Sequence, residues 1–261
     1  EAFSKAKAYG EAWDTYNKSK TQKGFRGAPP AYSHRLETLS DILKGNIIIH
    51  CHSYRADEIY MLLKVCTDFG IKKLVFQHVN EGFKVAPELA KFGAMASVFA
   101  DWWAYKFEVY YSTAYNAAIL TKNGVVTSIN SDDGELMRHL YHEAGKTQKY
   151  GGLTDDEALS LITINPAKQL GIENRVGSLE VGKEADVAIF QGHPLSTYAI
   201  PVITVVDGIV RFDREKDPDD VRIYVDPKEP LDASVIHSTN DYVDNCMQQA
   251  ESNYNNLFEL K

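Results

Sequence analysis

Four short apolar runs recur between residues 47 and 133, and they predict four β-strands. The first run, Ile47 to Ile49, leads directly into His50-Cys51-His52. The other three runs cover residues 73–78, 93–99 and 125–133. A continuous apolar run of this length is typical of a strand buried on both faces, as in a parallel sheet.

Helical periodicity fills the intervals between these runs. Apolar residues recur at helical spacing in residues 1–20, 36–43, 59–69 and 85–92. Gly45 and Gly70 stand where two of these helices would end. The aromatic-rich residues 101–123 predict a long loop followed by a helix. This alternation, with about 25 residues per strand and helix, indicates βαβ crossovers and a parallel sheet.

The pattern changes after the fourth strand. Residues 135–150 are predicted to be helical, and Thr154 to Glu157 have the spacing of a capping box that opens the next helix. Asn165 to Gly171 predicts a short helix with proline near its start and glycine just past its end. After residue 175 the period becomes two, which predicts a turn-rich hairpin over 176–183 and strands at 186–190, 202–206 and 209–212. Asp207-Gly208 is a hairpin-turn signal.

Histidines and carboxylates follow the ends of these strands. His50 and His52 close the first run, His78 closes the second, and Asp132 follows the fourth. Residues i and i+2 of a strand point to the same side, so His50 and His52 both face one site, and Cys51 between them faces away. The carboxyl ends of parallel strands are where α/β folds place their chemistry. These side chains are ligands for zinc or a similar divalent ion.

The composition narrows the class of protein. The 261 residues are 44% apolar and 25% charged, with a net charge of -8, as in a soluble globular protein. The acidic balance argues against nucleic acid as the main partner. No apolar run approaches the roughly 20 residues that span a bilayer, so no membrane partner is expected. The three cysteines form no CxxC motif and are interpreted as buried or free thiols.

Six motifs in residues 154–213 give the chain a resemblance to a known family. They are the capping box, Asn165-Pro166-Ala167, Leu170-Gly171, Val176-Gly177-Ser178-Leu179, Gly182-Lys183-Glu184-Ala185-Asp186 and Val206-Asp207-Gly208. In this order they resemble the C-terminal half of the metal-dependent amidohydrolases, nearest to the imidazolonepropionase-like and Xaa-Pro-dipeptidase-like branch. The resemblance covers residues 1 to about 213. It implies a TIM-like (β/α)8 barrel followed by part of a small β-sandwich.

The resemblance also implies roles for the residues at the strand ends. His50 and His78 match the metal ligands after barrel strands five and six, and Asp132 matches the strand-eight aspartate, which is both ligand and general base. His52 is expected to contact substrate or support a ligand, and Arg55 to bind a substrate carboxylate. The expected cofactor is a divalent metal, zinc above others, as one or two ions. The expected activity is hydrolysis of C–N bonds in an amide, cyclic amide or small peptide.

The chain departs from the family pattern in one respect, and this departure leads to an alternative to the hydrolase function. The family's HxH pair on strand one and its bridging carboxylate or lysine on strand four have no match. His50 and Asp132 are only 82 residues apart in sequence, whereas a complete barrel needs roughly 200 residues or more. We therefore interpret residues 1–174 as strands five to eight of a barrel, 175–213 as the β-sandwich return segment, and 214–261 as a linker and C-terminal tail.

A half barrel has two consequences for function. The chain alone is expected to be inactive, and the alternative to a hydrolase is a catalytically incomplete partner that completes a barrel with another chain. Its exposed sheet edges favour a homo-oligomer or an N-terminal half-barrel partner. A flavodoxin-like binding module is disfavoured, because no glycine-rich phosphate loop follows a strand.

Overall fold

The computed structural model describes residues 1–102 and 106–216. The chain divides into two units, Glu1–Phe212 and Asp213–Lys261, and only residues 213–216 of the second unit are among those described. The predicted linker and terminal helix from residue 217 onward lie outside the described residues. The prediction of a domain boundary at residue 174 is not tested by this division and stays a prediction.

The centre of the first unit is a four-stranded parallel sheet. Its strands are β1 (Ile49–Ser53), β2 (Leu74–His78), β3 (Met95–Val98) and β4 (Thr127–Ile129), and they lie in this order across the sheet. Each is followed in sequence by at least one helix, as βαβ crossovers require. The four apolar runs therefore form the four predicted strands, and the chain has an α/β fold with a parallel sheet.

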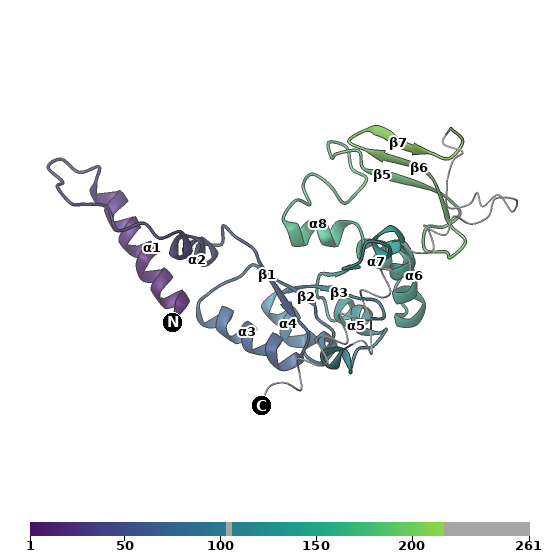
Figure 1. The fold of residues 1–261 in the computed structure, drawn as a ribbon, viewed down its shortest axis with the longest axis horizontal. Coiled ribbons are helices and arrows are strands. Elements are labelled where there is room, and N and C mark those ends of the chain that lie inside the picture. Colours follow the sequence, from purple (N-terminus) through teal and green to yellow (C-terminus); the bar gives the residue numbers. More distant parts are fainter. Residues whose placement is uncertain (103–105, 217–261) are drawn as a thin grey trace, which may run out of the picture. The chain divides into compact units, whose positions relative to one another are not determined.

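Helices cover one face of this sheet. Figure 1 shows α3 (Ala56–Asp68), α4 (Ala86–Phe92) and α5 (Asn116–Lys122) along the same side of the strands. The hydrophobic core lies between them: Leu74, Phe76 and Ala96 are fully buried there. Burial of this apolar surface supplies the main stabilisation, at about 25 cal/mol per Å².

The opposite face carries polar side chains in register. His52 pairs across the sheet with Gln77, Gln77 with Ser97, and Ser97 with Ser128. We call these four residues the polar row. Cys51, Phe76, Ala96 and Thr127, one position earlier on each strand, form the matching apolar row on the helix-covered face. Cys51 packs against the core, so it does face away from His50 and His52.

Helices before and after the sheet complete the first unit. α1 (Ala2–Ser19) packs against α2 (His34–Lys44), which ends at Gly45 in a left-handed conformation as predicted. After β4 come α6 (Leu140–Gly151), α7 (Asp155–Ser160) and α8 (Ile164–Leu170). Thr154 and Glu157 form both hydrogen bonds of the capping box. Short 3-10 helices, η1, η2 and η3, cover Gly82–Lys84, Phe107–Val109 and Leu136–His139.

On α8, Gln169 is buried and binds the sheet. Its amide nitrogen donates to the carbonyl oxygens of Ala96 at 3.0 Å and Val126 at 3.2 Å, and its Oε1 accepts from Ser128 Oγ at 2.8 Å. Because Ser128 belongs to the polar row, α8 contacts the face opposite to α3, α4 and α5. This contact satisfies a polar group that would otherwise be buried without a partner.

A second sheet contains β5 (Val187–Gln191), β6 (Ile200–Val206) and β7 (Ile209–Asp213) in that order. β5 and β6 are antiparallel. Asp207 and Gly208 have φ of 52° and 74°, both left-handed, as a type I′ hairpin turn requires. The three predicted strands of this region are confirmed.

The hairpin predicted over residues 176–183 is wrong, because no strand forms there. The segment is a series of turns closed by two contacts between Arg175 and Glu184: the Glu184 N–H donates to the Arg175 carbonyl at 2.8 Å, and the two side chains form an ion pair. Gly177 has φ of 93°, and a Cβ there would lie 2.9 Å from that of Ala167. The glycine therefore allows the turn to pack closely on α8. An extended strand with a side chain at this position would not fit there.

Candidate functional site at the strand ends

Two histidines from neighbouring strands meet at the carboxyl end of the parallel sheet. His52 Nδ1 on β1 lies 2.7 Å from His78 Nε2 at the end of β2. The His78 ring stacks with two aromatic rings: that of Tyr54, parallel to it with centroids 4.7 Å apart, and that of Phe99, at 5.1 Å. The Phe99 ring in turn stacks on Trp102. Stacking with two aromatic rings restrains the plane of the His78 imidazole.

The backbone at these strand ends is strained. His78, Val79 and Asp132 have φ of 70°, 49° and 48°, which non-glycine residues seldom adopt. Val79 is held there by a hydrogen bond from its N–H to the Ser53 carbonyl at 2.9 Å and by one from Asn116 Nδ2 to its own carbonyl at 2.8 Å. Such conformations cost about 1–3 kcal/mol each and cluster at functional sites.

The surroundings of His78 favour its neutral form. Burial lowers the pKa of His78 below its usual 6.5, nearby His52 and Lys106 lower it further, and Asp132 raises it. Its Nδ1 is buried, and no group among the described residues forms a hydrogen bond with it. A neutral imidazole with an unused nitrogen is the form that binds a metal ion or accepts a proton.

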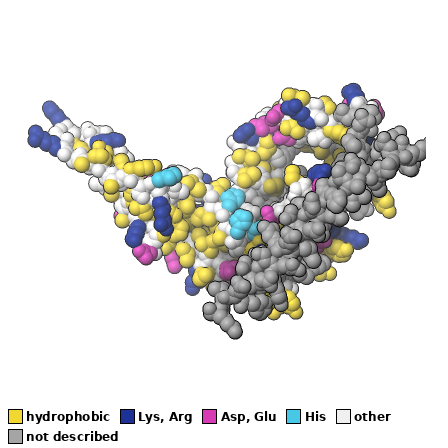
Figure 2. All heavy atoms as spheres, in the orientation of Figure 1, with side chains coloured by type: hydrophobic (Ala, Val, Ile, Leu, Met, Phe, Trp, Pro, Cys, Tyr) yellow, Lys and Arg dark blue, Asp and Glu magenta, His cyan; other side chains and the backbone are white. Residues whose placement is uncertain are grey.

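The other predicted residues are placed near this pair but differ in their contacts. His50 is exposed, and its Nδ1 lies 3.0 Å from the side-chain amide nitrogen of Gln77 in the polar row. Asp132 is close enough for its charge to act on His78. Asp133 Oδ1 accepts hydrogen bonds from the N–H groups of Glu135 and Leu136, so it caps the following turn. Figure 2 shows histidine side chains gathered at the surface near the middle of the view.

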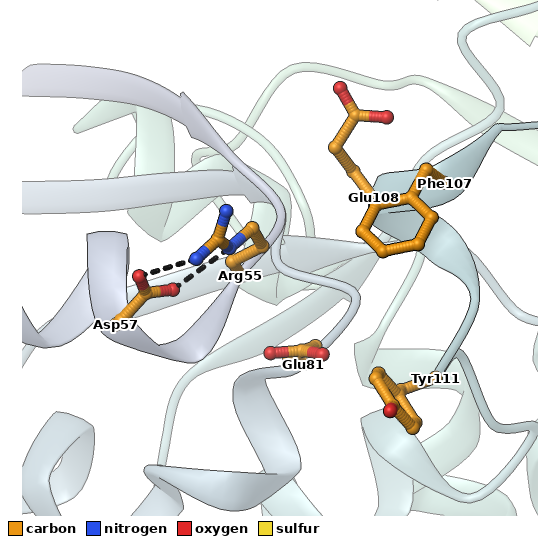
Figure 3. A pocket seen from close by; sticks show the side chains of 6 residues that line it. All are labelled: Arg55, Asp57, Glu81, Phe107, Glu108 and Tyr111. Carbon is orange, nitrogen blue, oxygen red and sulfur yellow. Dashed lines mark hydrogen bonds and ion pairs between the residues drawn. The ribbon is translucent and has the colours of Figure 1, made fainter.

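Arg55, the third residue after His52, lines a pocket of about 290 Å³. Its guanidinium donates two hydrogen bonds to the Asp57 carboxylate, at 3.0 and 2.7 Å (Figure 3). This pair raises the pKa of Arg55 and lowers that of Asp57. Glu81 in the pocket wall donates its N–H to the carbonyl of Tyr54, the residue whose ring stacks on His78, so one backbone hydrogen bond links the pocket to the site.

The side chains fit a divalent metal in their chemistry. Two or three imidazoles and a carboxylate are ligands that zinc accepts, and the Nδ1 of His78 has no hydrogen-bond partner in the part of the chain that the structure describes. Within residues 1–102 and 106–216, however, no three His, Cys, Asp or Glu side chains are already grouped closely enough to hold an ion. The assignment of His50, His78 and Asp132 as a ligand set stays a prediction.

Sequence reasoning missed two contacts at this site. Gln77, whose side chain contacts His50, carried a usable signal, because it is a polar residue in an otherwise apolar run. Phe99 carried none, since it ends an apolar run like many core residues. Its stacking on His78 depends on how β2 and β3 are placed side by side.

Comparisons with known proteins agree with the family resemblance seen in the sequence. The family model described as "Amidohydrolase family" matches residues 104–219. "Amidohydrolase tasK" of Hapsidospora irregularis is 30% identical over 183 residues, which are 68% of this chain and 18% of that protein. The imidazolonepropionase of Shewanella frigidimarina is 58% identical over 38 residues, 15% of this chain and 9% of that protein.

Among solved structures, an amidohydrolase from Thermotoga maritima superposes with a TM-score of 0.69 and 27% sequence identity. The match covers 82% of this chain and 54% of that one. These findings confirm the resemblance to the amidohydrolase family. The chain spans less than a fifth of the Hapsidospora relative and about half of the Thermotoga protein. Among the helices of the described ranges, none is long and apolar enough to cross a membrane.

Proposed function

We propose that this chain supplies the strand-end half of a metal-dependent hydrolase site for C–N bonds in an amide, cyclic amide or small peptide. The observation that carries the proposal is the contact between His52 and His78, at 2.7 Å, where β2 ends in left-handed backbone beside its parallel neighbour β1. The relatives are amidohydrolases by name, which supports the reaction class. His78 combines ring stacking, burial and a left-handed backbone, and packing of the sheet alone does not require this combination.

In this proposal His50, His78 and Asp132 hold one or two divalent ions, with zinc the best match to imidazole and carboxylate ligands. A bound zinc ion would make water acidic enough to lose a proton near neutral pH and would polarise the substrate carbonyl. The Asp132 carboxylate accepts the proton of the attacking water and returns it to the leaving nitrogen. His52, in contact with His78, orients that imidazole.

Arg55 is the proposed contact for a substrate carboxylate. Its guanidinium already binds a carboxylate, that of Asp57, in the two-pronged manner such a ligand would use. Asp57 lies in the first turn of α3, where N–H groups of Asp57 and Glu58 also stabilise its charge. A substrate carboxylate therefore exchanges with Asp57, which keeps its backbone partners.

The test replaces Asp132 by asparagine and follows hydrolysis of dipeptide and cyclic-amide substrates with added zinc. The 261-residue chain alone is expected to show negligible turnover, because the family's strand-one histidines are missing. In a longer or assembled form that is active, Asp132→Asn is expected to lower kcat by about 10²–10⁴-fold. The matched control is Asp133→Asn, which keeps the Oδ1 that accepts the capping hydrogen bonds. Full turnover by the chain alone, or by Asp132→Asn, contradicts the proposal.

A second candidate function is that of an assembly partner, a half barrel comprising strands five to eight. The observation in its favour is the order of the sheet, in which β1 and β4 are edge strands that pair on one side only with other described strands. Edge strands offer N–H and C=O groups to another chain, and each such group left buried and unpaired costs about 1–3 kcal/mol. We expect a homo-oligomer, or a complex with an N-terminal half barrel.

Sedimentation velocity at micromolar concentration tests this assembly, combined with hydrogen exchange at β1 and β4. The expected result is a dimer or larger species in which the amides of both edge strands are protected. A clean monomer whose edge-strand amides exchange freely would show that the chain does not assemble through them.

A further inference from the structure

The pocket that contains Arg55 has more acidic than basic groups in its wall. It is lined by Arg55, Asp57, Glu81, Phe107, Glu108 and Tyr111, with a volume of about 290 Å³. Figure 3 shows Arg55, Asp57 and Glu81 on one side and Phe107, Glu108 and Tyr111 across from them. The pocket is large enough for a small organic group, and its wall holds three carboxylates against one guanidinium.

Most of these charges already have partners. Arg55 is bound by Asp57, as described above. Glu81 has a largely buried side chain that accepts the Ala56 N–H at 2.9 Å and Lys84 Nζ at 2.8 Å. Glu108 is exposed, and no group in the described part of the chain pairs with its carboxylate. Once the two ion pairs are set aside, the pocket therefore keeps one negative charge, on Glu108.

Aromatic rings around the pocket already receive cations. Lys84 Nζ lies 4.1 Å from the ring centroid of Tyr111, which lines the pocket. Lys106 Nζ lies 3.6 Å from the ring centroid of Tyr54, which stacks on His78. Both distances are within the range of about 6 Å in which a cation is attracted to a ring face. The Phe107 side chain is exposed and lies next to Glu108 at the wall.

We propose that this pocket binds a positively charged group of the substrate, an ammonium or guanidinium, between the Glu108 carboxylate and the rings of Phe107 and Tyr111. Glu108 supplies the charge that neither ion pair neutralises, and the rings supply cation–π attraction. A hydrogen bond from the Glu81 N–H to the Tyr54 carbonyl, at 2.9 Å, ties the pocket to the loop that holds the histidine pair. A substrate could then place a cationic side chain here and its C–N bond near His78; this part rests on the proposed function.

Binding is tested without turnover, on the 261-residue chain, by calorimetric titration with arginine amide whose α-amino group is acetylated. Citrulline amide, acetylated in the same way, is the neutral probe of nearly the same shape. The variants are Glu108→Gln, which keeps the shape and removes the charge, and Phe107→Leu. Glu88→Gln, at an exposed position on α4 outside the pocket, is the matched control. Circular dichroism checks that each variant is folded.

We expect arginine amide to bind more tightly than citrulline amide. Glu108→Gln should weaken its binding by about fivefold, Phe107→Leu by a similar factor, and Glu88→Gln not at all. Equal binding of the two amides, no saturable binding of arginine amide, or an unchanged affinity in Glu108→Gln overturns the proposal. Because nothing is hydrolysed, this result is independent of the Asp132→Asn test, and either proposal can fail alone.

Discussion

The two faces of the parallel sheet use alternate residues of the same strands for different purposes. The apolar row contains Phe76 and Ala96, which are completely buried under the helices. The polar row contains His52, Gln77, Ser97 and Ser128, and each of them has a side-chain hydrogen bond: to His78, His50, Asn130 and Gln169 respectively. The first row holds the sheet to its helices, and the second arranges chemical groups.

The difference between the two faces predicts which positions tolerate substitution without loss of stability. A buried aromatic side chain such as Phe76 contributes to stability through the apolar area it removes from water, and its loss leaves a cavity. Gln77 is half-buried and contributes one hydrogen bond to an exposed histidine. Substitution of Phe76 is therefore expected to lower stability severalfold more than substitution of the neighbouring Gln77. Substitution of Gln77 is expected to affect the site more than substitution of Phe76.

The largest expected effect is on Phe76. Phe76→Ala should lower the free energy of unfolding by about 3–5 kcal/mol, whereas Gln77→Ala should lower it by about 1 kcal/mol or less. Urea unfolding followed by circular dichroism measures both, with an unchanged m-value as the control for a simple change in stability. Similar losses for the two variants would contradict the assignment of the faces.

A smaller effect concerns His142 on α6, a helix that contacts β4. Burial lowers the pKa of His142 below its usual 6.5, and nearby His139 and Lys146 lower it further. The unfolded chain therefore binds this proton more readily. The stabilisation is complete above pH 6.5 and is lost as the pH falls toward the lower pKa of the folded state.

His142→Phe should accordingly flatten the loss of stability between about pH 7 and about pH 5. Denaturant unfolding at several pH values measures this slope, and His34→Gln, at an exposed position on α2, serves as the control. A slope that changes in the control and not in His142→Phe would show that another group titrates.

Local patterns were sufficient to predict most of the fold. Apolar runs predicted the four parallel strands, the capping box at Thr154 formed as expected, and Asp207-Gly208 adopted the turn that its sequence favours. These features depend on neighbours in sequence. The error at residues 176–183 has the same origin, because the packing of Gly177 on Ala167 is a contact between segments and leaves no mark on local periodicity.

The site was less predictable because it depends on register and on backbone strain. Alternation places His50 and His52 on one face, but the pairing of Ser53 with His78 decides that His52 is the histidine in contact with His78. Regular alternation would also put His78 on the same face as Phe76. Its left-handed backbone departs from that pattern, and its ring meets His52 instead. No residue type in this stretch predicts a left-handed backbone at His78.

The most direct test of the account is zinc binding by the 261-residue chain, measured by isothermal titration calorimetry. We predict weak but saturable binding that is reduced at least tenfold by His78→Ala and by Asp132→Asn. His34→Ala, at an exposed residue remote in sequence from the strand ends, should bind as the wild type does. Folded His78→Ala and Asp132→Asn proteins that bind zinc as tightly as the wild type, or a wild type that does not bind it, would contradict a metal-dependent site at these strand ends.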